Sequence, residues 1–221
     1  MTDPKASRKF THMKTIDLNN WPRKSLYDYF RSLSSPHFSL TAEVDVTGLI
    51  TKAKPAGVSV FNATLFAIMK ACNSIPEFRQ RIKGEEVVEF DTVNVAPTVP
   101  IEGDRFAFCY FEYAADWQEF NEACIRSIQE AKRQTELSDK SGTRDDLIFT
   151  TCLPWVSFTS MQHPVQGPDD SFPRVAWGKF FERDGRWHMP VNVQAHHALL
   201  DGLHMGKFYE GTQAALDEFG K

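Results

Sequence analysis

The chain has 221 residues and a net charge of −4, and 42% of its residues are hydrophobic. This length fits one large domain or two small ones, and the apolar content excludes a disordered chain. The sequence contains no basic stripe, so we expect no nucleic-acid partner. No apolar run approaches the ~18 residues needed to span a bilayer, and the N-terminus lacks the apolar core of a secretory signal. We therefore expect a cytoplasmic protein without a membrane partner.

The first part of the chain is expected to be a flexible arm over residues 1–14, followed by a single domain over residues 15–221. Alternation of apolar and polar residues after the arm predicts a half-buried strand, and a segment that is apolar nearly all round predicts a core helix. In order, the predicted elements of this half are a helix over 21–33, a strand over 38–46, a helix over 59–74 and a strand over 86–95 that is broken at Asp91.

The second half continues the mixture of strands and helices. Asp116 and Glu119 resemble a capping box at a helix start, and the dipeptide Asp184-Gly185 is typical of a tight hairpin. In order, the predicted elements are a strand over 106–113, a helix from 117 to about 134, strands over 147–158, 174–183 and 187–195, and a helix over 204–219. The intermixed order predicts an α/β sandwich domain.

Four ionisable residues crowd into nine positions at the predicted junction of the last strand and the last helix: His196, His197, Asp201 and His204. A zinc site is one interpretation, but the spacing is not H-E-x-x-H and no Cys or Glu adjoins, so we expect no metal. A serine-hydrolase triad requires a nucleophile elbow, and the sequence has no G-x-S-x-G. Structural histidines and a histidine general base, acting on a substrate hydroxyl, remain open.

The same run resembles a known active-site signature. Residues 194–204, read Gln-Ala-His-His-Ala-Leu-Leu-Asp-Gly-Leu-His, are similar to the signature of the chloramphenicol acetyltransferases. Further resemblances occur in the same order, at Asn20-Trp21-Pro22-Arg23, Phe38-Ser39-Leu40-Thr41, Glu77-Phe78-Arg79 and residues 153–158. The similarity runs from about Thr15 to the C-terminus. It implies the two-layer α/β sandwich of the coenzyme-A-dependent acyltransferases, a mixed sheet with flanking helices.

The resemblance also implies a mechanism and a set of site residues. His197 would be the general base that deprotonates an acceptor hydroxyl, which attacks the thioester of acetyl-CoA without an acyl-enzyme. Thr151 occupies the position of a serine that stabilises the oxyanion, and its extra methyl restricts the rotamers of the hydroxyl. Asp201 would pair with Arg23 to support the site, and His196 would serve structure. The resemblance places Trp155 and Lys179 near coenzyme A.

The acceptor pocket is implied to include three aromatic residues and to depart from the family elsewhere. Tyr29, Phe38 and Phe106 match aromatic or apolar pocket positions. Four other positions differ, with Ser138 for a phenylalanine, His163 for a leucine, Ala176 for a threonine and Leu203 for an aromatic residue. Two polar walls would weaken the binding of an aromatic, dichlorinated acceptor by roughly a few kcal/mol, so we expect either chloramphenicol or a related amphipathic alcohol as the acceptor.

Several functions and one assembly follow as expectations. The family implies antibiotic resistance and a homotrimer whose sites lie between subunits. Alternatives are the same chemistry on an unrelated alcohol or with another acyl group, and a non-catalytic binding protein on the same fold. A dihydrolipoyl acyltransferase core is a further alternative that we expect to require a lipoyl domain and a linker, for which the sequence gives no sign.

Overall fold

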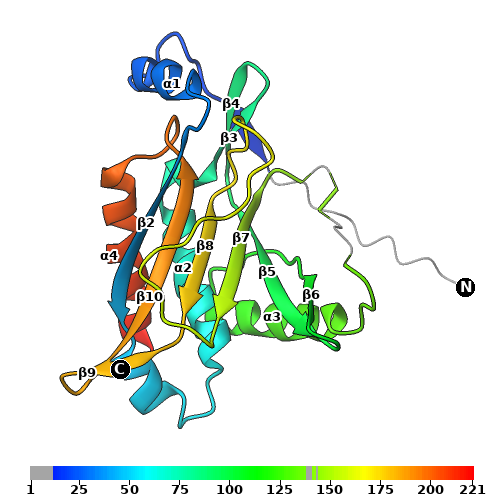
Figure 1. Ribbon diagram of the computed structural model, residues 1–221, viewed down its shortest axis with the longest axis vertical. Helices are drawn as coiled ribbons and strands as arrows, with labels where there is room; N and C mark the ends of the chain where they lie inside the picture. The colour runs from blue at the N-terminus through cyan, green and yellow to red at the C-terminus, as the bar shows by residue number, and fades with distance from the viewer. Residues whose placement is uncertain (1–11, 138–140, 143) are drawn as a thin grey trace, which may run out of the picture.

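The computed structural model describes residues 12–137, 141–142 and 144–221, and a mixed β-sheet is its central element (Figure 1). Within these residues the sheet has seven strands in the order β2-β10-β8-β7-β5-β6, with β9 paired to β10. The pairs β5–β7 and β7–β8 are parallel and the others antiparallel. The strands are β2 (His37–Asp45), β5 (Asn94–Ile101), β6 (Arg105–Phe108), β7 (Leu147–Leu153), β8 (Arg174–Gly178), β9 (Phe181–Arg183) and β10 (Arg186–His196).

Helices α2 (Val60–Ser74), α3 (Trp117–Ala131) and α4 (Gly202–Glu218) lie on one face of this sheet, behind it in Figure 1. Helix α1 (Lys24–Arg31) lies beyond one end of the sheet, and there is a π-helical turn at Leu49–Ala53 and a 3-10 turn at Pro76–Arg79. Helix α2 begins where the Ser59 hydroxyl accepts from the Asn62 N–H, and α3 where the Asp116 carboxylate accepts from the Glu119 N–H. Such caps satisfy backbone donors that a helix start leaves free. None of the described helices is long and apolar enough to cross a membrane.

A second, three-stranded sheet carries the start of the described chain. Its order is β1-β4-β3, formed by β1 (Met13–Thr15), β4 (Glu86–Phe90) and β3 (Gln80–Lys83). Residues 1–11 of the expected arm lie outside the described residues, whereas Met13 and Lys14 belong to β1 and pair with β4. All three β1 side chains are exposed, so the strand leaves no apolar alternation in the sequence.

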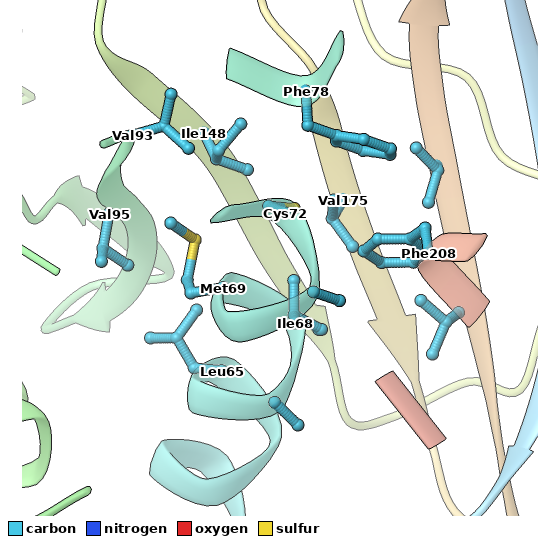
Figure 2. Close-up of a cluster of buried hydrophobic side chains, with 14 of the residues drawn as sticks. Leu65, Ile68, Met69, Cys72, Phe78, Val93, Val95, Ile148, Val175 and Phe208 are labelled. Atoms are coloured by element: carbon cyan, nitrogen blue, oxygen red, sulfur yellow. The ribbon is translucent and has the colours of Figure 1, made fainter. Parts of the chain in front are cut away.

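The core lies between the helices and the large sheet (Figure 2). Side chains of α2 pack there against the strands and against Phe208 of α4. The residues labelled in the close-up are fully or almost fully buried: Leu65, Ile68, Met69, Cys72, Phe78, Val93, Val95, Ile148, Val175 and Phe208. Burial of each large apolar side chain stabilises the fold by roughly 1.5–3 kcal/mol.

No helix of the described part of the chain lies on the opposite face of the sheet, which carries a row of mostly polar residues (Figure 1). Because paired residues point to the same side of a sheet, Thr41, Asn192, Ala176 and Thr151 form one row across it. The segment 154–173 crosses this face, since the Ser39 hydroxyl donates to the Met161 carbonyl (2.8 Å). We call this surface the helix-free face. It carries Thr151, one of the candidate site residues.

Most of the elements predicted from the sequence are present, and the α/β sandwich is confirmed. The expected helix over 21–33 is shorter, because a turn at Pro22–Arg23 precedes it and α1 runs only from Lys24 to Arg31. The expected strand over 174–183 is two strands, β8 and β9. The hairpin between β9 and β10 is confirmed, with Asp184 and Gly185 at φ 53° and 75°.

Candidate active site

His197 lies directly after β10, in the turn that leads to α4. Its N–H donates to the Pro36 carbonyl (2.8 Å), which joins the end of β10 to the segment before β2. The imidazole stacks on the Phe30 ring of α1, with ring centres 3.8 Å apart and planes 6° from parallel. Phe38 of β2 lies on it at 4.4 Å and an angle of 32°. Two aromatic rings from separate elements therefore fix the imidazole plane.

The hydrogen bond of the His197 ring decides which nitrogen carries the proton. Nδ1 lies 3.1 Å from the Leu200 carbonyl oxygen. A carbonyl only accepts, so a neutral ring bonded there holds its proton on Nδ1 and its lone pair on Nε2. This is the tautomer that a general base requires, and it is set by a backbone group and not by a carboxylate.

Asp201 supports the next element instead of the histidine ring. Its side chain caps α4 by accepting from the Leu203 N–H (3.0 Å), and Oδ2 accepts from Arg23 Nη1 (2.7 Å). Burial acts to raise the pKa of this carboxyl, but the hydrogen bond and charge of Arg23, the charge of His204 and the Leu203 N–H together outweigh it and keep the pKa below the ordinary value. The two residues are 178 positions apart in the sequence, so the pair ties the start of α1 to the start of α4.

A second histidine extends this pair into a network. The Asp201 N–H donates to His204 Nδ1 (3.0 Å), which completes the capping box of α4. His204 Nε2 lies 3.4 Å from Glu77 Oε1 and is buried. The hydrogen bond from His204 lowers the pKa of Glu77 although burial opposes the shift. The network Arg23–Asp201–His204–Glu77 therefore connects the start of α1, the start of α4 and the 3-10 turn, next to the turn that contains His197.

His196 is fully buried, and both of its ring nitrogens contact backbone groups. Its Nε2 lies 2.8 Å from the Pro168 carbonyl oxygen, and its Nδ1 accepts from the Ala198 N–H (3.2 Å). Burial lowers its pKa to about 4, so the ring is neutral near pH 7. The His196 ring therefore joins the turn after β10 to the segment that contains Pro168.

Thr151 is not brought to His197 within one chain. It lies on β7, in register through Ala176 with Asn192 of β10, five residues before His197. Five residues of strand span ~17 Å, and two strand spacings add ~10 Å across the sheet. An oxyanion donor and a general base act on groups about 3 Å away, so one chain does not assemble both at one substrate.

Of the other expected site residues, some lie near His197 and one lies in the half of the sheet that carries Thr151. Tyr29 lies on α1 beside Phe30, with ring centres 5.1 Å apart, and is 62% exposed. Phe106 lies on β6, at the opposite edge of the sheet from β2, and is 47% exposed. Tyr29 and Phe38 therefore accompany His197, whereas Phe106 belongs to the half of the sheet that carries Thr151.

Trp155 and Lys179 are brought together. Trp155 follows β7 and is 74% exposed, and the Lys179 N–H donates to the carbonyl of the adjoining Val156 (2.8 Å). An exposed aromatic side chain and an exposed lysine on adjoining backbone segments suit a ligand with a flat base and phosphates. Among the described residues, no group of three or more His, Cys, Asp or Glu side chains is arranged to hold a metal ion.

Two of the expected departures from the family, His163 and Ala176, lie on or against the helix-free face. Ser138 lies outside the described residues. His163 donates its N–H to the Gln194 side chain (2.6 Å) and accepts from it (3.0 Å). Burial lowers the pKa of the His163 ring to about 4.

Sequence reasoning missed three contacts of the site. Phe30 was expected only as an apolar helix residue, yet it stacks on His197; its spacing of seven from Arg23, two helical turns, indicates a shared helix face. Glu77 was noted only in the family resemblance. The Leu200 carbonyl, which sets the His197 tautomer, left no signal, since every residue has a carbonyl.

The architecture defines the chain as a sandwich of the coenzyme-A-dependent acyltransferase type. It superimposes on a probable dihydrolipoamide acetyltransferase from Listeria monocytogenes with a TM-score of 0.65 at 16% identity, covering 90% of this chain and 93% of the other, which shows a common fold. A solved structure of a chloramphenicol acetyltransferase matches more closely, with a TM-score of 0.84 and 31% identity over 93% of this chain and 100% of the other.

The family follows from the sequence comparisons. Residues 11–213 match the family model described as chloramphenicol acetyltransferase. Chloramphenicol acetyltransferase 2 of Escherichia coli is 31% identical over 93% of this chain and 98% of its own length. A chloramphenicol acetyltransferase of a Klebsiella species is 28% identical over 96% of this chain and 97% of its own. The chain belongs to the chloramphenicol acetyltransferase family and is an acyltransferase.

Proposed function

We propose that the protein transfers the acetyl group of acetyl-CoA to a hydroxyl of chloramphenicol or a related amphipathic alcohol. The observation that carries this proposal is the His197 tautomer: Nδ1 is bonded to the Leu200 carbonyl, so Nε2 holds a lone pair for a substrate proton. Phe30 and Phe38 prevent the ring from turning away. Family membership supplies the reaction class.

The reaction would proceed in two steps: the acceptor hydroxyl attacks the thioester, and the tetrahedral intermediate then breaks down. His197 Nε2 takes the hydroxyl proton as the acceptor oxygen bonds to the thioester carbonyl carbon. The Thr151 hydroxyl donates a hydrogen bond to the oxyanion that forms. The carbon–sulfur bond then breaks, and the proton on the imidazolium passes to the departing thiolate of coenzyme A. Asp201 and Arg23 support the base, and Trp155 and Lys179 contact coenzyme A near the site.

We further propose that the site forms between subunits of a homotrimer. The separation of Thr151 and His197 within one chain supports a shared site, and the number three comes from the family. Tyr29 and Phe38 of one subunit and Phe106 of the next would enclose the acceptor. Both halves expose aromatic side chains that a shared, partly apolar pocket would cover.

A complementation experiment tests the shared site. His197→Ala and Thr151→Ala chains are each prepared alone and then unfolded and refolded as an equal mixture. In a random mixture, about one quarter of shared sites combine an intact His197 with an intact Thr151, so activity returns to about that fraction of the wild type. If each site lies within one chain, the mixture is no more active than its components.

A steady-state assay of the wild type tests the acceptor. Release of free thiol from acetyl-CoA is followed with chloramphenicol as the acceptor. A kcat/KM below roughly 10² M⁻¹s⁻¹, far under the usual enzyme range, rejects chloramphenicol as the acceptor. The polar His163 and the small Ala176 near Thr151 favour a second candidate, the same chemistry on another alcohol or acyl group, which a panel of alcohols and acyl-CoA thioesters tests. No turnover with any pair favours a binding protein.

A further inference from the structure

The two adjacent histidines at the end of β10 hold opposite tautomers. The His196 Nε2 faces the Pro168 carbonyl (2.8 Å) and carries a proton, while Nδ1 accepts from the Ala198 N–H (3.2 Å). His197 has the reverse arrangement, with its proton on Nδ1. Both assignments come from backbone partners. His196 is fully buried and uses both ring nitrogens, in two different directions.

The Nδ1 side of His196 holds the turn that orients His197. The Ala198 N–H bonds to this nitrogen, and the Leu199 and Leu200 N–H groups both donate to the His196 carbonyl (3.1 Å each). These bonds fix the turn that ends at the Leu200 carbonyl, the group to which His197 Nδ1 is bonded. The His196 ring therefore holds the turn, and the turn places the carbonyl that keeps the proton of the proposed base on Nδ1.

The Nε2 side of His196 holds the segment that crosses the helix-free face. Besides the Pro168 carbonyl, this segment is held at Asp170, whose carbonyl lies 2.6 Å from His37 Nε2. The His37 and His196 rings meet edge-on with centres 5.1 Å apart. Its earlier part is joined to β10 through the paired bonds between His163 and Gln194. Hydrogen bonds at His163, Pro168 and Asp170 therefore hold the segment over the face that carries Thr151.

We propose that His196 is a positioning residue with two separable tasks. Its Nδ1 maintains the turn that orients the base. Its Nε2 maintains the segment 163–173 over the helix-free face, where we place part of the acceptor pocket. The proposal rests on the acyl transfer assigned to His197. A histidine with a merely structural role would affect folding alone. The two tasks predict separate effects on kcat and on the KM of the acceptor.

Two amide substitutions separate the tasks. In His196→Asn, the amide oxygen takes the place of Nδ1 and accepts from the Ala198 N–H, but nothing reaches the Pro168 carbonyl. In His196→Gln, the longer amide nitrogen reaches the position of Nε2 and donates to the Pro168 carbonyl, but nothing accepts from the Ala198 N–H. Each variant therefore loses one of the two hydrogen bonds and keeps the other.

The expected result is a split between the two kinetic constants. One hydrogen bond is worth about 1 kcal/mol, a factor of five to ten, so His196→Gln lowers kcat about tenfold with acceptor KM within about threefold. His196→Asn raises acceptor KM about tenfold with kcat within about threefold of the wild type. In the ¹⁵N spectrum of the His197 ring, the Nδ1-protonated form dominates in the wild type and His196→Asn, and a mixture appears in His196→Gln.

A control variant keeps the test decisive if a His196 variant does not fold. His37 is partly buried and contacts both the His196 ring and the Asp170 carbonyl. His37→Phe keeps an aromatic ring against His196 and removes only the hydrogen bond to the Asp170 carbonyl. It is expected to raise acceptor KM and to leave the ¹⁵N spectrum of His197 unchanged. The proposal is overturned if the folded variants lower kcat and raise KM together in proportion to their loss of stability, or if His37→Phe alters the tautomer.

The outcome also separates this proposal from the proposed function. If the wild type transfers no acyl group from any thioester to any alcohol of the panel, the proposed function fails, and the ¹⁵N spectra alone decide whether His196 controls the turn. If the wild type is active and neither the kinetic split nor the tautomer change appears, the function stands and the positioning role of His196 is rejected.

Discussion

The ion pair between Arg23 and Asp201 gives the sharpest stability prediction, because its two partners are not equivalent. Asp201→Asn keeps the oxygen that caps α4 but removes the negative charge beside Arg23. The Arg23 side chain is 17% exposed, and its Nε and Nη2 are buried without a hydrogen-bond partner among the described residues. Leaving such a cation unpaired costs about 3–5 kcal/mol, and its partial exposure puts the expected loss at about 3 kcal/mol.

Removing the other partner is expected to cost less. In Arg23→Met the cation disappears, and Asp201 is left 29% exposed at the start of α4. A carboxylate at a helix N-terminus is stabilised by about 0.3–1 kcal/mol and keeps its bond to the Leu203 N–H. The expected loss is therefore about 1 kcal/mol, leaving an asymmetry of about 2 kcal/mol between the two variants.

Denaturant unfolding at one fixed protein concentration measures both losses, since assembly makes stability concentration-dependent. Lys24→Met is the matched control, because its pair with Asp28 is exposed on both sides and is expected to change the unfolding free energy by less than about 0.5 kcal/mol. The reasoning is refuted if Arg23→Met costs as much as Asp201→Asn, or if neither variant differs from the control.

Three further predictions concern pH, glycine positions and the stacked ring. Burial lowers the pKa of His163 and His196 to about 4, so the unfolded chain binds these protons first as pH falls. The free energy of unfolding should therefore decline from about pH 6.5 to about pH 4, by at most about 3 kcal/mol per histidine, and His163→Leu should lessen the slope in denaturant titrations. Gly48→Ala should lower stability by about 1–3 kcal/mol, because its Cβ would lie 2.5 Å from backbone, whereas Gly206→Ala, in open space within α4, should raise it by about 0.5–1 kcal/mol. Phe30→Leu removes the stacked ring from the proposed base and should lower kcat about fivefold at unchanged melting temperature; an unchanged kcat contradicts the role of the stack.

Local patterns in the sequence predicted the elements that local physics determines. The apolar segment that became α2, the capping residue Asp116 and the Asp184-Gly185 hairpin each depend on interactions within a few residues. The start of α1 was placed three residues too early, since turn and helix share the same residue types there. Strand β1 was missed because its side chains are exposed and only its backbone is paired.

The site was predictable to the extent that it depends on residue type. The His-His-x-x-x-Asp-Gly run pointed to the histidines, and family resemblance alone linked Asp201 to Arg23, which are 178 residues apart. The tautomer of His197 could not be predicted, because it depends on the position of one backbone carbonyl. The distance of Thr151 from His197 follows from strand order and register, which the sequence pattern does not specify.

The role of His197 as the base is the central claim, and one comparison tests it most directly. Release of thiol from acetyl-CoA in the presence of an active acceptor is measured for the wild type and for His197→Ala, with melting curves to confirm that both are folded. Loss of a general base costs at least about 10²-fold, so kcat of the variant should fall by that factor or more at a similar KM for acetyl-CoA. A folded variant that keeps more than about a tenth of the wild-type kcat contradicts the account.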